Sequence, residues 1–142
     1  LCVNCIPFLE VFHQTRREIM QSIRGKGNKT TELKLLALLK EHKLTGWRRH
    51  QPLPGKPDFV FPRKRLAIFV DGCFWHGCPS CYKEPKKNKA FWKNKVQGNQ
   101  RRDRRVDRQL REKGWSVCRI WECRLKKPEV VLRRISMMLE LV

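Results

Sequence analysis

The stretch VDGCFWHGCPSC, at residues 70 to 81, constrains the fold of this chain more than any other. Its glycines and proline predict a loop, and its cysteines form the pattern C-x4-C-x2-C: Cys73, Cys78 and Cys81. That spacing is typical of a structural zinc site, in which thiolate or imidazole ligands complete a tetrahedron. The stretch therefore predicts a loop held by zinc, with a set of buried free thiols as the alternative.

The spacing leaves the fourth zinc ligand open between two residues. His76 lies inside the loop itself, whereas Cys123 follows a predicted strand that could return it to the same place. Another cysteine, Cys118, lies in the apolar run WSVCRIW, where a small buried hydrophobic residue explains it better than a metal ligand does. A zinc deaminase is excluded, because that chemistry needs a glutamate two residues after the liganding histidine, where this chain has Cys78.

The charge of the chain favours a polyanionic partner. Its 142 residues include 33 Lys and Arg against 13 Asp and Glu, a net charge of +20 that is spread through most of the sequence. Such a field is favourable beside nucleic acid, although a solvated basic surface of ribosomal or histone-like type would carry it as well. The sequence has no apolar run of about 18 residues, which excludes a membrane-spanning helix.

Length and the opening residues set the expected domain organisation. A chain of 142 residues suits one domain, and the opening LCVNCIPFLEVFHQ lacks the basic start and cleavage site of a signal peptide. We therefore leave residues 1–15 unassigned and expect a single domain over residues 16–142. The seven cysteines are odd in number and partly at metal-like spacing, which favours a reducing cytoplasm over a disulfide framework.

Hydrophobic patterns predict the elements of the first half. Leucines at helical spacing predict a buried helix over residues 31–42, and a short strand candidate follows within 46–57. The runs DFVF and RLAIFVD, at 58–61 and 65–71, are rich in β-branched and aromatic residues and predict a hairpin across PRK.

The second half begins with a basic segment, residues 91–114, that predicts a long helix ended by Gly114. Its apolar stripe consists of Trp92, Val96, Val106 and Leu110, and the polar residues Asn99 and Asp103 fall on the same stripe. A strand at WSVCRIW and a helix from Pro128 to Leu141 complete the order helix, three strands, helix, strand, helix. This order predicts an α/β layer structure with a mixed sheet.

One acid, Asp58, comes at the start of a predicted strand, directly after a turn. A carboxylate at that position either pairs with a basic neighbour or binds a hard cation that must meet a phosphate. The residues around Asp58 leave both interpretations open.

Five segments together resemble one known family: TELKLL, LPGKPDFVFP, AIFVDGCFWHGCPSC, FWKNKVQGNQRRDRRV and GWSVCRIWEC. They resemble the very-short-patch repair endonucleases, which are DNA mismatch nickases of the restriction-endonuclease-like superfamily. The resemblance covers residues 16 to about 126. It implies a restriction-endonuclease-like α/β fold, with a central mixed β-sheet flanked by helices and a structural zinc site.

The resemblance also implies roles for particular residues. Asp58 would bind a catalytic Mg²⁺ together with the backbone carbonyl of Val70, His76 would be the general base, and Glu32 would support the site. Zn²⁺ would be held by Cys73, Cys78, Cys81 and Cys123. Asn99 and Asp103 would orient the water at the metal.

The same resemblance implies that aromatic side chains enter the DNA. Wedges of this kind unstack a base step, which costs least where pairing is already faulty. The implied DNA-binding residues are Met20, Phe74, Trp75 and Trp92; for Trp92, packing in the core is the alternative. One departure is that the usual E-x-K of the wider superfamily reads Phe69-Val70-Asp71 here, which leaves the role of Asp71 open.

The expected function is therefore that of a monomeric, magnesium-dependent endonuclease. It would nick one strand of double-stranded DNA at a T·G mismatch, such as deamination of 5-methylcytosine leaves, in the bacterial cytoplasm at the nucleoid. Mismatch-repair proteins are candidate partners. The alternatives are a zinc-stabilised DNA-binding module without catalysis and a nicking endonuclease of related fold without mismatch preference.

Overall fold

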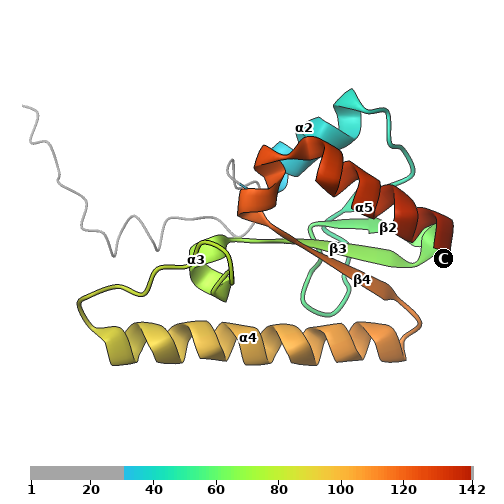
Figure 1. Cartoon of the computed structure of the whole chain (residues 1–142). Helices are drawn as coiled ribbons and strands as arrows, with labels where there is room; N and C mark the ends of the chain where they lie inside the picture. The colour runs from blue at the N-terminus through green and yellow to red at the C-terminus, as the bar shows by residue number, and fades with distance from the viewer. Residues whose placement is uncertain (1–30, 142) are drawn as a thin grey trace, which may run out of the picture.

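The computed structural model describes residues 31–141, so the leader at 1–15 and the candidate wedge residue Met20 lie outside the described residues. The described chain forms a sheet between helices (Figure 1). Its elements are α2 (Glu32–Glu41), β1 (Arg48–Arg49), β2 (Phe59–Phe61), β3 (Leu66–Asp71), α3 (Cys73–His76), α4 (Lys89–Glu112), β4 (Ser116–Trp121) and α5 (Pro128–Leu141), with 3₁₀ turns at Pro62–Lys64 and Glu122–Lys126.

The four strands lie in the order β1-β2-β3-β4. The first three pair antiparallel, and the segment PRK turns the chain between β2 and β3 as the sequence predicts. Strand β4 then pairs parallel with β3 after the crossover through α4. The prediction of an α/β domain with a mixed sheet flanked by helices is confirmed.

The sheet is covered on both faces (Figure 1). Helices α2 and α5 pack on one face, where the core includes Leu35, Ile68 and Ile135, and α4 packs on the other, over Phe69. Alternate residues of β3 point to opposite faces, so every residue of this strand is buried. Asp71, the last residue of β3, shares the face of Phe69 and therefore lies beneath α4.

The cysteine loop differs from the prediction over four residues. Cys73–His76 form one helical turn, α3, rather than an irregular loop. Gly77 ends this turn in the left-handed region, at φ +66°, and a Cβ there would lie 2.7 Å from a methyl carbon of Val96 on α4. Glycine therefore both closes the turn and lets it approach α4, a tertiary contact that the local sequence does not reveal.

Two further observations concern the burial of Cys118 and the length and polarity of the helices. Cys118 is fully buried in the core between the sheet and α5, which confirms its prediction as a small hydrophobic residue. Among residues 31–141, no helix is both long and apolar enough to cross a membrane.

Candidate active site

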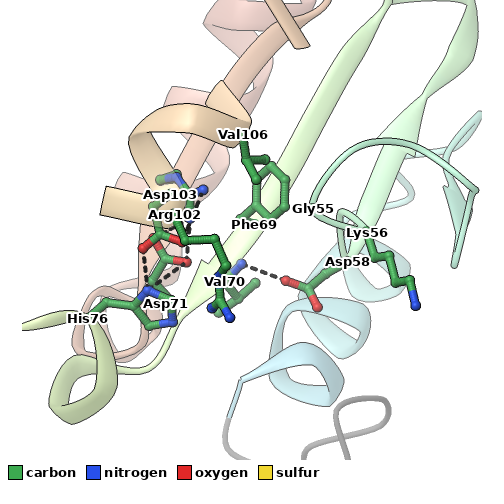
Figure 2. Close-up of a pocket in the computed structure, with 11 residues that line it drawn as sticks. Gly55, Lys56, Asp58, Phe69, Val70, Asp71, His76, Arg102, Asp103 and Val106 are labelled. Carbon is green, nitrogen blue, oxygen red and sulfur yellow. Dashed lines mark hydrogen bonds and ion pairs between the residues drawn. The ribbon is translucent and has the colours of Figure 1, made fainter. Parts of the chain in front are cut away.

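A pocket of about 440 Å³ opens where the C-terminal end of β3 meets α3, α4 and the turn before β2 (Figure 2). It is lined by Gly55, Lys56, Asp58, Phe69, Val70, Asp71, His76, Arg102, Asp103, Val106 and Arg119. Three residues with predicted catalytic or water-orienting roles, far apart in the sequence, thus share one cavity: Asp58, His76 and Asp103. The cavity combines carboxylates, an imidazole and basic side chains, which is the composition of a hydrolytic site.

Asp58 enters the pocket from the residue before β2. The hairpin register pairs Phe59 with Ile68, and the backbone N–H of Val70 donates to Asp58 Oδ2 at 2.7 Å. Burial raises the pKa of Asp58 to about 6; the Val70 N–H opposes this rise, and the charges of Glu32 and Asp71 add to it. In the described chain, no Lys or Arg side chain forms an ion pair with Asp58. Among residues 31–141, its negative charge is therefore compensated only in part, by the Val70 N–H and by the charge of Arg49, which does not pair with it.

His76 is held by a carboxylate on α4. Its Nδ1 lies 2.5 Å from Asp103 Oδ2 and 4.0 Å from Asp71 Oδ1. Burial works against the charge of Asp103, but the hydrogen bond and charge of His76, with the charge of Arg119, lower the pKa of Asp103 below its ordinary value. An ionised Asp103 accepts a hydrogen bond from the Nδ1–H group, which leaves Nε2 as the unprotonated nitrogen of the neutral ring.

Two side-chain amides fasten α3 to α4. Asn99 donates through Nδ2 to the carbonyl of Trp75 at 2.8 Å, and Gln100 donates through Nε2 to the carbonyl of His76 at 3.0 Å. The structure thus brings Asn99 to the backbone of α3, beside His76, and its predicted role toward water stays a prediction. Gln100 has no predicted role, and its position shows that α4 fixes the backbone that carries His76.

Glu32, the first residue of α2, is almost fully buried. Arg49 donates through Nε to Glu32 Oε1 at 2.9 Å and contacts the same oxygen through Nη2, and His50 Nε2 lies 3.4 Å from it. Glu32 acts on Asp58 through its charge, because it contributes to the raised pKa of that carboxyl group. Its predicted supporting role is consistent with this placement and stays a prediction.

The sequence interpretation missed Arg119. This side chain extends from β4 and forms ion pairs with three carboxylates: Asp71, Asp103 and Asp107. The only local signal is one charged residue inside the otherwise apolar strand WSVCRIW. Asp71 is 5% exposed and is one of these partners, which gives a structural role to the residue that departs from the superfamily pattern.

The four cysteines with predicted zinc-binding roles converge on one point. The Sγ atoms of Cys73, Cys78, Cys81 and Cys123 all lie within 4.8 Å of one another. Those of Cys78 and Cys123 are 3.8 Å apart, and two ligands about 2.3 Å from a tetrahedral zinc are separated by about the same distance. Burial opposes the Cys78 thiolate, yet hydrogen bonds from the N–H groups of Ser80 and Cys81 help lower its pKa to about 7. The donor set therefore fits zinc.

The predicted wedge residues Phe74, Trp75 and Trp92 form one aromatic cluster. The ring centroids of Phe74 and Trp75 are 5.4 Å apart, and those of Phe74 and Trp92 are 5.2 Å apart, both in edge-to-face geometry. All three are partly exposed, whereas Val96 further along α4 is buried. Trp92 therefore lies outside the buried core of the α4 stripe.

Comparison with known proteins identifies the family. A family model described as DNA mismatch endonuclease Vsr matches residues 10–83, more than half of the chain. The DNA mismatch endonuclease Vsr of Escherichia coli K12 is 39% identical over 117 residues, which covers 81% of this chain and 74% of that protein. The chain belongs to the Vsr family. The predicted membership of the very-short-patch repair endonucleases is thus confirmed.

Other relatives of this Vsr-family chain carry a different description. The type II nicking enzyme V.XorIIP of Xanthomonas oryzae pv. oryzae is 40% identical over 116 residues, covering 79% of this chain and 82% of that enzyme. The catalytic domain of the homing endonuclease I-Bth0305I aligns at 22% identity with a TM-score of 0.49, over 75% of this chain and 90% of that chain. As a Vsr-family member, the chain is an endodeoxyribonuclease, a DNA-repair hydrolase that acts on DNA.

Proposed function

We propose that this Vsr-family endonuclease nicks one strand of duplex DNA at T·G mismatches, with Mg²⁺ bound by Asp58 and the carbonyl of Val70. The observation that carries the proposal is the pairing, across one pocket, of a poorly compensated carboxylate with a carboxylate-bound histidine. The first is suited to a cation and the second to accepting a proton.

The residues of the Asp58 side fit magnesium. Mg²⁺ prefers oxygen ligands and is usually bound by one or two carboxylates together with substrate phosphate and water. A half-buried Asp58 with a raised pKa offers such a carboxylate, and the peptide of Val70 is beside it. When bound there, the cation would polarise a phosphoryl oxygen and stabilise charge on the leaving oxygen.

The residues of the other side act on the attacking water. His76 accepts its proton at Nε2, because Nδ1 is already bonded to Asp103. Asp103 then stabilises the imidazolium that forms. The four cysteines would hold zinc, which would keep α3 folded and maintain the position of His76 relative to Asp58.

The DNA would bind along a strongly basic surface. The exposed side chains of α4 include Arg101, Arg104, Arg105, Arg108 and Arg111. Contacts from such arginines to phosphates supply affinity and register without reading sequence. The proposal includes action as a monomer in the bacterial cytoplasm, at the nucleoid, with mismatch-repair proteins as candidate partners.

Preference for T·G rests on the aromatic cluster of Phe74, Trp75 and Trp92. The partly exposed rings of Phe74 and Trp75 on α3 and of Trp92 on α4 can unstack a base step, which costs a few kcal/mol and least at a mismatch. The E. coli relative is itself named a mismatch endonuclease. A second candidate, nicking without mismatch preference, is favoured by the relatives that are named type II nicking enzymes.

The test uses two pools of end-labelled duplexes with the same randomised flanks around a central T·G or T·A pair. We expect zinc-loaded protein with Mg²⁺ to nick one strand of the T·G pool and to leave the T·A pool intact. Sequencing of the products reports the preferred flanks, and the Asp58→Asn variant is the inactive control. Equal nicking of both pools would overturn the mismatch proposal and support the second candidate.

A further inference from the structure

The side chain of Arg119 is fixed in position by both its strand and an aromatic ring. Arg119 is the register partner of Phe69 in the parallel pair β3–β4, so both side chains lie on the face covered by α4. Its guanidinium carbon lies 4.4 Å from the centroid of the Phe69 ring. This cation–π contact holds the guanidinium against the Phe69 ring and limits the directions that its N–H groups can take.

Those N–H groups are distributed over three carboxylates. Nε donates to Asp107 Oδ1 at 2.9 Å, Nη1 donates to Asp71 Oδ1 and Oδ2 at 2.8 and 3.0 Å, and Nη2 lies 3.5 Å from Asp103 Oδ1. Asp71 ends β3, whereas Asp103 and Asp107 are one turn apart on α4. Burial opposes the charge of Arg119, but the acids raise the pKa of its guanidinium above the ordinary value, Asp71 most of all. A permanent positive charge therefore joins the end of β3 to α4.

Two of these carboxylates are within reach of the same histidine nitrogen. His76 Nδ1 is 2.5 Å from Asp103 Oδ2 and 4.0 Å from Asp71 Oδ1. Both oxygens of Asp71 are bonded to Arg119, whereas Asp103 turns one oxygen to Arg119 and the other to His76. The Arg119 guanidinium thus keeps Asp71 from bonding to His76 and orients Asp103 toward His76.

We propose that Arg119 is a positioning residue for nicking, which selects Asp103 over Asp71 as the partner of His76 Nδ1 and so fixes the ring for proton transfer at Nε2. The inference rests on the proposed role of His76. A charge that only stabilised the fold would not control which carboxylate His76 contacts. The two possibilities therefore differ in the rate of nicking and in the state of the His76 ring.

The conservative variant Arg119→Lys keeps the charge but loses the planar fork. We expect its single-turnover nicking rate, at saturating DNA and Mg²⁺, to fall by about 10- to 100-fold, because small misplacements of a reacting group have effects of this size. The dissociation constant for DNA should not change, since Arg119 would act through His76. The matched control is Asp107→Asn, which removes the negative charge of one partner of the same guanidinium and should leave the rate close to that of wild type.

A second variant separates positioning from stability. In Arg119→Met, Asp71 loses its cation and can compete for His76, so the rate should fall, and adding Asp71→Asn should restore a large part of it. Nitrogen-15 NMR of the His76 ring at fixed pH gives a readout without nicking: a Nδ1–H tautomer in wild type and Asp107→Asn, and an altered ring signal in Arg119→Lys. Zinc content and circular dichroism confirm that each variant is folded.

Two results would overturn the inference. One is an equal loss of rate in Arg119→Lys and Asp107→Asn; the other is an unchanged His76 signal in Arg119→Lys together with no recovery on adding Asp71→Asn. Failure of the proposed function is distinguishable from both, because His76→Ala would then nick as fast as wild type.

Discussion

The carboxylates on the two sides of the pocket, Asp58 on one and Asp103 on the other, are stabilised to different extents. Figure 2 shows Val70 between Asp58 on one side and Asp71, His76 and Asp103 on the other. Asp58 has one backbone N–H for a partner, and its pKa is raised to about 6, whereas Asp103 has a lowered pKa between His76 and Arg119. One side therefore carries a charge that needs a cation, and the other has a built-in guanidinium.

This difference indicates a division of labour. On the proposed function, a site that binds Mg²⁺ cannot hold an arginine paired with the same carboxylate, and the cost of burying Asp58 would be relieved by the metal. On the same proposal, the site that accepts a proton needs a fixed ring and an ionised partner, and the contacts of Arg119 with Asp103 and of Asp103 with His76 would supply both. The boundary is the end of β3, where the Val70 N–H is bonded to Asp58 and the Asp71 side chain turns to α4.

The largest expected effect comes from removing the charge of Asp58, the proposed ligand of Mg²⁺. Asp58→Asn keeps the shape and the bond from Val70 but removes the charge that holds Mg²⁺, so nicking should fall by about 10⁴-fold or more at any practical magnesium level. Binding to the mismatched duplex should survive. Gel-based nicking and fluorescence anisotropy measure the two properties, and substantial nicking by the variant would contradict the assignment of Asp58.

Removing His76, the proposed proton acceptor, should lower the rate of nicking by a smaller factor. His76→Ala leaves the cation site intact and removes only the proton acceptor, so the rate should fall by about 10²- to 10⁴-fold. Activity should recover in part as rising pH supplies hydroxide. Zinc content, measured by elemental analysis, should not change; its loss would mean that His76 is a ligand and that the base must be sought elsewhere.

Much of the fold could be predicted from local pattern. Strand β3 is a continuous apolar run because both faces of the sheet are covered, and α4 shows its buried stripe in Val96, Val106 and Leu110. The cysteine spacing indicated a shared site, and Cys123 returns to the loop because β4 runs parallel to β3. These features are encoded within single segments or by their order along the chain.

The features that escaped prediction depend on tertiary contacts. The β3–β4 register pairs Phe69 with Arg119 and Asp71 with Trp121, which places the Arg119 side chain within reach of Asp71. No local pattern encodes a bond between two strands that are separated in sequence by α4. The α3 turn likewise depends on Gly77 against Val96. Asn99 shares a helix face with Asp103, yet only the structure shows that it bonds the backbone of Trp75.

The next largest effect concerns the zinc site that is proposed to hold α3 and His76 in place. Cys123→Ser should lower the zinc content and reduce the free energy of unfolding by more than about 4 kcal/mol, because loss of a structural metal is among the most destabilising changes. Cys118→Ser is the matched control; an unpaired buried hydroxyl should cost about 1–3 kcal/mol and leave zinc in place. Equal losses of stability and zinc in the two variants would argue against Cys123 as a ligand.

A smaller effect concerns the contribution of Asp58 to the free energy of unfolding. Because the folded pKa of Asp58 is raised from 3.8 to about 6, the folded state keeps a proton that the unfolded state releases, so stability falls as pH rises across this window. Without Mg²⁺, Asp58→Asn should therefore be more stable than wild type by about 2–3 kcal/mol at pH 7.5, with a smaller gain at pH 5. Urea unfolding in magnesium-free buffer without chelator, which spares the zinc, measures both; a destabilised variant at pH 7.5 would contradict the account.

The most direct test of the central claim is calorimetric titration of Mg²⁺ into zinc-loaded protein, with wild type compared with Asp58→Asn and Asp103→Asn. Both substitutions remove one carboxylate from the same pocket, so each is the control for the other. We expect saturable binding in wild type, its loss in Asp58→Asn and its retention in Asp103→Asn. Loss of binding in Asp103→Asn with retention in Asp58→Asn would contradict this expectation, because the cation would then lie among Asp71, His76 and Asp103.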